Sequence, residues 1–110
     1  MAQRSNLYVD AGSTYNTIIT VAASNGQALD LTGYSVASQM RKSYQSSTYH
    51  AFTASVYDAT AGKIRLQLTD EQSGAIPHGR WLYDVEIESP TGARTRVIEG
   101  IVTVNPQITQ

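Results

Sequence analysis

The chain contains no cysteine among its 110 residues, and only 15% of its side chains are charged. Without a thiol it has no disulfide framework, no thiolate zinc site and no cysteine nucleophile. The formal net charge is −1, so the composition offers no basic surface of the kind that holds a nucleic acid backbone. We therefore expect no nucleic acid among its partners.

Long apolar runs are also missing. No stretch approaches the roughly 20 apolar residues that a membrane-spanning helix needs, and residues 1–6 lack the apolar core of a signal peptide. We expect neither a membrane partner nor export. A typical domain takes about 100–200 residues, so residues 1–110 are expected to form a single domain with extended N- and C-terminal tails.

Most of the sequence alternates between apolar and polar residues with the period of a β-strand. The clearest stretch is 80–88, which places Trp81 on the core face as an anchor. About seven strands are expected, over residues 7–10, 15–23, 34–42, 49–57, 63–68 and 80–88 and after the turn at 90–92. With turn signals every dozen residues or so, this pattern predicts an all-β fold, specifically an Ig-like antiparallel β-sandwich.

One short helical turn is expected near residues 70–76. Thr69 and Gln72 have the spacing of a capping box, in which each side chain bonds the other residue's backbone N–H. Gly74 and Pro77 should end the turn, because neither residue favours continuing a helix. The two acids at 70–71 suit a helix N-terminus better than a calcium site.

The last hairpin is specified in more detail. Pro90-Thr91-Gly92 suits a three-residue loop, and this register sets Glu88 opposite Arg94 and Glu86 opposite Arg96. In the strand that follows, residues 97 and 102 should both face the core. They are an odd number of positions apart, however, and in a regular strand such residues lie on opposite faces. A β-bulge at 99–100 is the predicted solution.

Catalytic chemistry finds little support in the sequence. His50 and His78 are the two histidines, and neither lies in a nucleophile motif or at a metal-ligand spacing. Asp84, Glu86 and Glu88 follow one face of a strand about 7 Å apart, near a glycosidase separation. The arginines expected opposite would lower their pKa values, whereas an acid catalyst needs a raised one. We expect no enzyme activity, no metal and no cofactor.

Tyrosine is the compositional exception, with seven residues against one Phe and one Trp. Exposed tyrosines favour protein interfaces, because the ring supplies apolar area and the hydroxyl a hydrogen bond. They could instead form a sugar-stacking platform, or lie half-buried at strand edges. The candidate interface residues are Tyr8, Tyr15, Tyr44, Tyr49, Tyr57 and Ile108.

Several segments together resemble the small β-sandwich domain of phage tail and baseplate proteins, a family that includes the N-terminal domain of baseplate upper proteins. The resemblance covers about residues 6–109. It is carried by the turn and Leu-Asp-Leu-Thr-Gly step in 26–34, by Gln39-Met40-Arg41, and by segments 62–69, 79–86 and 99–104. Baseplate upper proteins continue into helical stalks and receptor-binding parts, whereas this sequence stops after the domain, so we expect a structural or adaptor subunit.

The resemblance implies a non-enzymatic structural protein of a tailed-phage virion, assembled in the host cytoplasm. It would serve as a baseplate, neck or fibre-attachment adaptor, with other virion proteins as partners and a homo-oligomer in a symmetric assembly. Two alternatives remain open from the sequence: a carbohydrate-binding module that uses the exposed tyrosines to bind a glycan, and a capsid decoration protein.

Overall fold

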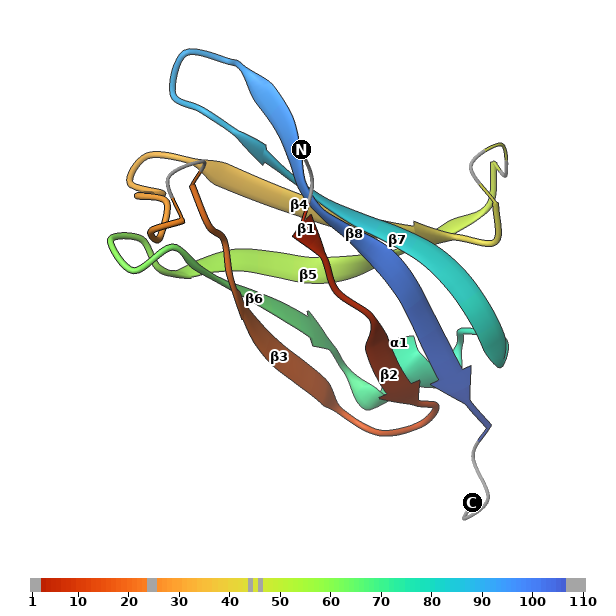
Figure 1. The fold of residues 1–110 in the computed structure, drawn as a ribbon. Helices are drawn as coiled ribbons and strands as arrows, with labels where there is room; N and C mark the ends of the chain where they lie inside the picture. The colour runs from red at the N-terminus through yellow and green to blue at the C-terminus, as the bar shows by residue number, and fades with distance from the viewer. Residues whose placement is uncertain (1–2, 24–25, 44, 46, 107–110) are drawn as a thin grey trace.

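The computed structural model describes residues 3–23, 26–43, 45 and 47–106, and strands dominate it (Figure 1). In chain order the elements are β1 (Gln3–Arg4), β2 (Leu7–Asp10), β3 (Tyr15–Thr20), β4 (Ser35–Arg41), β5 (Tyr49–Asp58), β6 (Lys63–Leu68), α1 (Asp70–Gly74), β7 (Gly79–Glu88) and β8 (Arg94–Asn105). Among the described residues, no helix is long and apolar enough to cross a membrane. The all-β prediction is confirmed.

The strands belong to one continuous sheet with the order β1-β8-β7-β4-β5-β6-β3, and β2 also pairs with β8. β1 and β2 run parallel to β8, while the other neighbours are antiparallel. The sheet is therefore mixed rather than purely antiparallel, and the Ig-like sandwich is not confirmed. The reason lies in residues 3–10, which join β8 from 95 positions away in the sequence.

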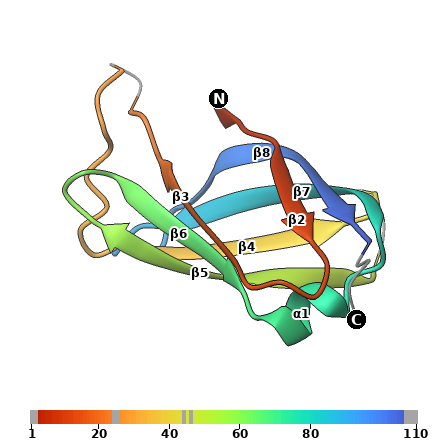
Figure 2. The same ribbon diagram turned by 90° about the horizontal axis from the view of Figure 1, so that it is seen from below.

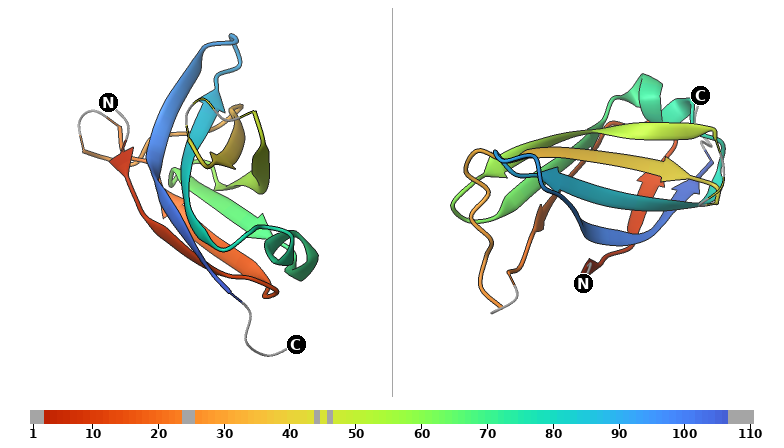
Figure 3. Two further views of the ribbon diagram at one scale, coloured as in Figure 1. Left: turned by 90° about the vertical axis from the view of Figure 1, so that its right-hand side faces the viewer. Right: turned by 90° about the horizontal axis from the view of Figure 1, so that it is seen from above.

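The sheet curls so strongly that its two ends face one another across the core (Figures 2 and 3). β5 makes the corner, because its residues 49–52 pair with β4 and its residues 53–58 pair with β6. We call β1, β2, β8, β7, β4 and the start of β5 the larger layer. The rest of β5, β6 and β3 form the smaller layer.

Alternate residues of each strand fill the space between the layers. On β7 the four inward positions are all buried, as predicted, and Trp81 donates its indole N–H to the Pro77 carbonyl at 3.0 Å. The described core consists of Leu7, Val9, Ile19, Val21, Leu31, Met40, Phe52, Ile64, Leu66, Leu68, Ile76, Trp81, Tyr83, Val85, Ile87, Ile98, Val102 and Val104. Burial of these side chains is the main force that holds the curled sheet closed.

The predicted helical turn is confirmed with its capping box. The Thr69 hydroxyl accepts from the Gln72 N–H at 3.1 Å, and the Gln72 side chain accepts from the Thr69 N–H at 2.8 Å. Ser73 is fully buried behind this turn. Its hydroxyl accepts from the Gly12 N–H at 3.1 Å and donates to the Ser13 carbonyl at 2.7 Å, which ties the helix to the β2–β3 loop.

The β7–β8 hairpin has the predicted register, with Glu88 opposite Arg94 and Glu86 opposite Arg96. The Gly92 N–H donates to the Ser89 carbonyl at 2.9 Å, which closes the loop. Gly92 has a φ of +92°, a value that favours glycine.

A β-bulge is present on β8, but its predicted position was wrong. Val85 pairs with Ile98 and the next residue of β7 pairs with Arg96, so Val97 is the extra residue. Ile98 consequently takes the core position expected for Val97. The bulge comes before Glu99-Gly100, and the parity is already restored there.

Gly100 has a different reason to be glycine. It faces inward, and a Cβ built on it would lie 2.1 Å from the Ser5 carbonyl oxygen. That carbonyl turns into the core between β1 and β2, where the Tyr83 hydroxyl donates a hydrogen bond to it. The Asn6 side chain supplies an acceptor to β8 in place of this carbonyl, since its Oδ1 accepts from the Ile101 N–H at 3.1 Å.

Between β3 and β4 the sequence predicts a tight connection over residues 29–33 whose two leucines point inward. Leu31 is buried and Leu29 is half-buried against the core. The Asp30 carboxylate accepts from the Thr32 hydroxyl at 2.6 Å and from its N–H at 3.0 Å, and these bonds lower the pKa of Asp30. The sequence also predicts an Asn-Gly turn over residues 24–27, and its residues 24 and 25 lie outside the described residues.

Within the expected N-terminal tail, residues 3–4 form strand β1 and pair with β8. Residues 1–2 and 107–110 lie outside the described part.

Candidate interaction surface

Three of the six candidate interface residues are exposed aromatic side chains. The exposed fraction is 67% for Tyr8, 49% for Tyr49 and 51% for Tyr57. Tyr44 and Ile108 lie outside the described residues. The exposure that an interface role requires is thus present at three positions.

Tyr15 differs from these three because its ring is half-buried. It lies 6.0 Å from the Phe52 ring, centroid to centroid, at the margin of the core. Burial raises the pKa of Tyr15, against a smaller lowering by its hydrogen bond with Thr17.

The exposed tyrosines lie on two different faces of the molecule. Tyr8 and Tyr49 belong to the outer face of the larger layer, on strands at opposite ends of it, and Tyr57 belongs to the outer face of the smaller layer. The Arg41 guanidinium carbon lies 5.0 Å from the Tyr49 ring centroid and covers that ring. The described tyrosines therefore do not form the row that a sugar-stacking platform would use.

The exposed surface of the smaller layer carries a mixed apolar and cationic cluster. Ile18 of β3 pairs in register with Arg65 of β6, and Ile18 is 43% exposed. The Arg65 guanidinium carbon lies 4.5 Å from the Tyr57 ring centroid, and its Nε is buried without a hydrogen-bond partner among the described residues. We call Ile18, Tyr57 and Arg65 the Tyr57 patch.

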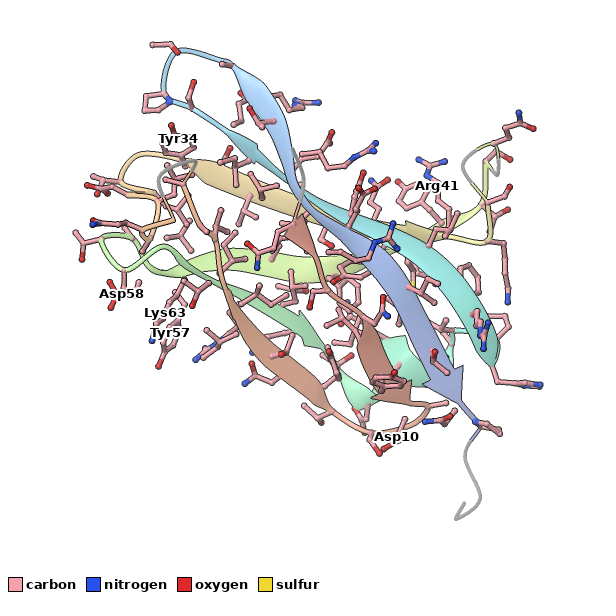
Figure 4. All side chains as sticks on the ribbon, viewed as in Figure 1. Asp10, Tyr34, Arg41, Tyr57, Asp58 and Lys63 are labelled. Atoms are coloured by element: carbon pink, nitrogen blue, oxygen red, sulfur yellow. The ribbon has the colours of Figure 1, made fainter. Side chains whose placement is uncertain are left out.

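Tyr57 and Arg41 lie on opposite sides of the molecule, as their labelled side chains show (Figure 4). Tyr57 points away from the sheet beside Lys63 and Asp58, at the end of β5 where the ladder shifts its register. This combination of an aromatic ring, an aliphatic side chain and a guanidinium is typical of protein interfaces.

The outer face of the larger layer is charged. Glu88 pairs with Arg94 at 2.9 Å, and this hydrogen bond raises the pKa of Arg94. Arg96 pairs with Asp84 at 3.1 Å, not with Glu86, which lies directly opposite it. The bulged residue between Arg96 and Ile98 alters the local twist, and the diagonal carboxylate comes within reach.

The same face is hollowed into a shallow pocket of about 220 Å³. It is lined by Gln39, Arg41, Ser43, Leu82, Tyr83, Asp84, Glu86, Arg96 and Glu99. The Asp84 carboxylate in this pocket is already held in an ion pair with Arg96. The geometry therefore suits polar contacts better than acid catalysis.

The two histidines have different surroundings. His50 packs edge-on against Trp81 with 5.2 Å between ring centroids, and His78 is exposed in the turn before β7. Within the described part of the chain, no group of three His, Asp or Glu side chains is placed to hold a metal ion. We assign these residues no chemistry.

Sequence reasoning missed Ile18 and Arg65. A signal was present, because Ile18 occupies the face that Thr20 and Ala22 mark as outward, so an exposed isoleucine could have been recognised. Arg65 of β6 pairs with Ser55 of β5, and its guanidinium lies over the ring of Tyr57, two positions further along β5. Alternation within one strand does not reveal this contact between strands.

Comparison with known proteins finds a similar solved structure but no sequence relative. No protein-family model matches the chain, and no curated protein sequence matches it. The solved structure described as the N-terminal domain of phage TP901-1 ORF48 superposes with a TM-score of 0.60 at 12% sequence identity. The match covers 92% of this chain and 85% of that one. The expected likeness to a small phage β domain is confirmed at the level of the fold.

Proposed function

We propose that this chain, which shares its fold with the N-terminal domain of phage TP901-1 ORF48, is a structural subunit of a tailed-phage virion. The observation that carries the proposal is this fold match over nearly the whole chain, together with the sequence resemblance to tail and baseplate proteins. Fold alone does not assign a role, so the surface has to agree with it.

The surface agrees in its chemistry. Tyr8, Tyr49 and the Tyr57 patch expose aromatic area, and guanidinium groups lie over the rings of Tyr49 and Tyr57; tyrosine and arginine are among the residue types that dominate binding energy at protein interfaces. In an assembly each would dock on a neighbouring virion protein. The work of such a subunit is to hold its partners in a fixed geometry, and its mechanism is binding rather than bond-making.

The assignment to the baseplate, neck or fibre attachment, as opposed to the capsid, rests on the tail and baseplate resemblance of segments such as 26–34 and 62–69. It includes a virion location, with assembly in the host cytoplasm.

The test is to purify the particles of the virus whose genome encodes this chain and to look for the chain in them. Mass spectrometry of gradient-purified particles should find it in stoichiometric amounts, and antibody labelling should mark the tail. Particles that lack the chain would overturn the proposal. Labelling of the capsid shell would refute the assignment to the tail.

A second arm tests the surface. Tyr8→Ala and Tyr49→Ala in the chain supplied in trans should reduce its incorporation into particles at least several-fold. Glu71→Gln, an exposed change at the helix start, serves as the control that leaves incorporation unchanged. Full incorporation of both tyrosine variants would exclude these side chains from the contact.

A further inference from the structure

β3 is the end strand of the sheet, and in the described part of the chain no strand pairs with its outer edge. The Val21 N–H donates to the Gly62 carbonyl at 2.8 Å, so odd-numbered residues direct their backbone groups toward β6. The even-numbered residues 16, 18 and 20 therefore direct their N–H and C=O groups to the outer edge. The Gln3 side-chain amide, which donates to the Thr20 carbonyl at 3.2 Å, confirms this parity.

This edge lacks the features that usually protect an end strand. The side chains of Asn16, Ile18 and Thr20 are exposed and uncharged, and β3 contains no proline, charge or bulge. The opposite end of the sheet is different. There β1 and β2 are short, are interrupted at Ser5-Asn6, and carry charged residues at positions 4 and 10.

The outer edge of β3 is complementary to itself. In an antiparallel pair, residues that exchange hydrogen bonds face each other directly. A two-fold axis at Ile18 sets Ile18 against Ile18 of a second copy and Asn16 against its Thr20, so that all three outward-directed residues find partners. The two Ile18 side chains would then cover each other on the outer face.

We propose that β3 pairs antiparallel with β3 of a second copy of this chain, which joins the two smaller layers into one sheet. This contact deepens the proposed function, because it names the symmetric interface through which the subunit would assemble.

Charge does not oppose the pairing. The nearest cations on this face, Lys63 and Arg65, lie on β6, so those of the two copies would be three strand spacings apart, about 14 Å. That separation exceeds the screening length of about 8 Å at physiological salt. The Gln3 contact with Thr20 is the competitor, and the Gln3 amide must move aside for the outermost bonds to form.

A strand of a different protein could use the same backbone groups. The second copy is favoured because one register satisfies every outward-directed residue and places no charge opposite a like charge. It is also always present at equal concentration.

Ile18→Pro tests the pairing directly. Proline removes an N–H that makes no ladder bond in the monomer, and proline is tolerated at such edge positions. In the dimer it removes two bonds, one from each copy. At about 1 kcal/mol net each, this weakens dimerisation about 30-fold, measured by sedimentation equilibrium.

Ile18→Lys is the second variant and decides the matter if the proline variant fails to fold. It sets two lysines opposite each other at the axis and should likewise weaken the dimer. Thr95→Lys adds the same charge at an exposed position of β8, in the other layer, and should leave dimerisation unchanged.

Ile18→Cys gives a positive signal in a chain that has no other cysteine. Hydrogen-bonded residues across antiparallel strands lie about 5.5 Å apart at Cα, within the range that a disulfide spans. Mild oxidation should therefore link I18C copies rapidly. Ser55→Cys, exposed on the same face but two strands away, should link slowly.

A wild-type chain that stays monomeric at millimolar concentration overturns the inference, as does a dimer that survives both Ile18→Pro and Ile18→Lys. If the chain is monomeric yet enters particles, and Ile18→Pro abolishes that entry, the edge takes a foreign strand and only the self-pairing is refuted. Absence from particles refutes the proposed function instead.

Discussion

Replacing Gly100 by alanine is the most direct test of how the N-terminal strands are held. The added Cβ would lie 2.1 Å from the Ser5 carbonyl oxygen and 2.9 Å from its carbon. A carbon and an oxygen need roughly 3.3 Å, so the Ser5 backbone must move by about 1 Å. Gly100 does not have a positive φ, and the close approach alone therefore decides the outcome.

The magnitude follows from the hydrogen bonds that this movement disturbs. They are the Ser5 N–H to Glu99 carbonyl bond at 3.0 Å, the Asn6 side-chain bond to Ile101 at 3.1 Å, and the bond from the Tyr83 hydroxyl to Ser5.

Each of these bonds contributes about 1 kcal/mol net, and alanine in a strand returns about 0.5–1 kcal/mol relative to glycine. The free energy of unfolding should therefore fall by about 2 kcal/mol. With an unfolding entropy of about 2.1 cal/mol/K per residue, the Tm should drop by roughly 9 °C.

The assay is urea and thermal unfolding of Gly100→Ala beside Gly74→Ala. A Cβ on Gly74 would meet Gly12 at 3.7 Å, an ordinary contact, so that control should be as stable as the wild type or slightly more so. Hydrogen exchange should also speed up at the Ile101 amide. A Gly100→Ala protein with unchanged Tm and an unchanged Ile101 amide would refute the reasoning.

Two further predictions concern the hydrogen-bonded hydroxyl groups of Tyr83 and Ser73. Burial raises the pKa of Tyr83 to about 12, above the unfolded value of 10.0, so the folded state binds more protons between these values and stability falls as pH rises from 10 to 12. Tyr83→Phe should lose about 1–3 kcal/mol at neutral pH, by urea unfolding, and flatten the alkaline fall; an unflattened curve would contradict the assignment. Ser73→Ala leaves the Gly12 N–H unpaired and should cost about 1–3 kcal/mol by the same measurement, whereas wild-type stability would show that the hydroxyl ties nothing down.

Local patterns were read correctly wherever the physical cause is local. The capping box at Thr69 and Gln72 needs only a spacing of three residues, and the structure has it. The buried face of β7 follows from strict alternation, and the β7–β8 register follows from a three-residue loop. In each case the residues that decide the geometry lie within about ten positions of one another.

The errors share a different cause. The bulge was expected at Glu99-Gly100 to restore the parity of the core positions, yet the extra residue is Val97 and the glycine accommodates Ser5. Arg96 was expected to pair with Glu86, but the twist at the bulge turned it toward Asp84. The environment of Gly100 depends on Ser5, which lies 95 positions away in the sequence and which no local pattern reveals.

The sequence predicted the residue types of the candidate interface but not where they lie on the molecule. Exposed tyrosines were expected, and Tyr8, Tyr49 and Tyr57 are exposed. Their division between two faces depends on the corner in β5, where one strand passes from the larger to the smaller layer. Alternation assigns a side chain to one side of its strand but does not say which layer that strand belongs to.

The sequence by itself determined that the chain is a β protein and which residues of most strands face inward. It also determined the positions of the short helix and of the turn in the last hairpin. These features follow from a period of two and from turn chemistry, which act over a few residues. Only the tertiary structure decided that residues 3–10 run parallel to β8, that the sheet curls until its two ends face one another across the core, and that no strand of the described residues pairs with the outer edge of β3. Pairing between strands 95 residues apart depends on the packing of the whole core, and no local pattern encodes it.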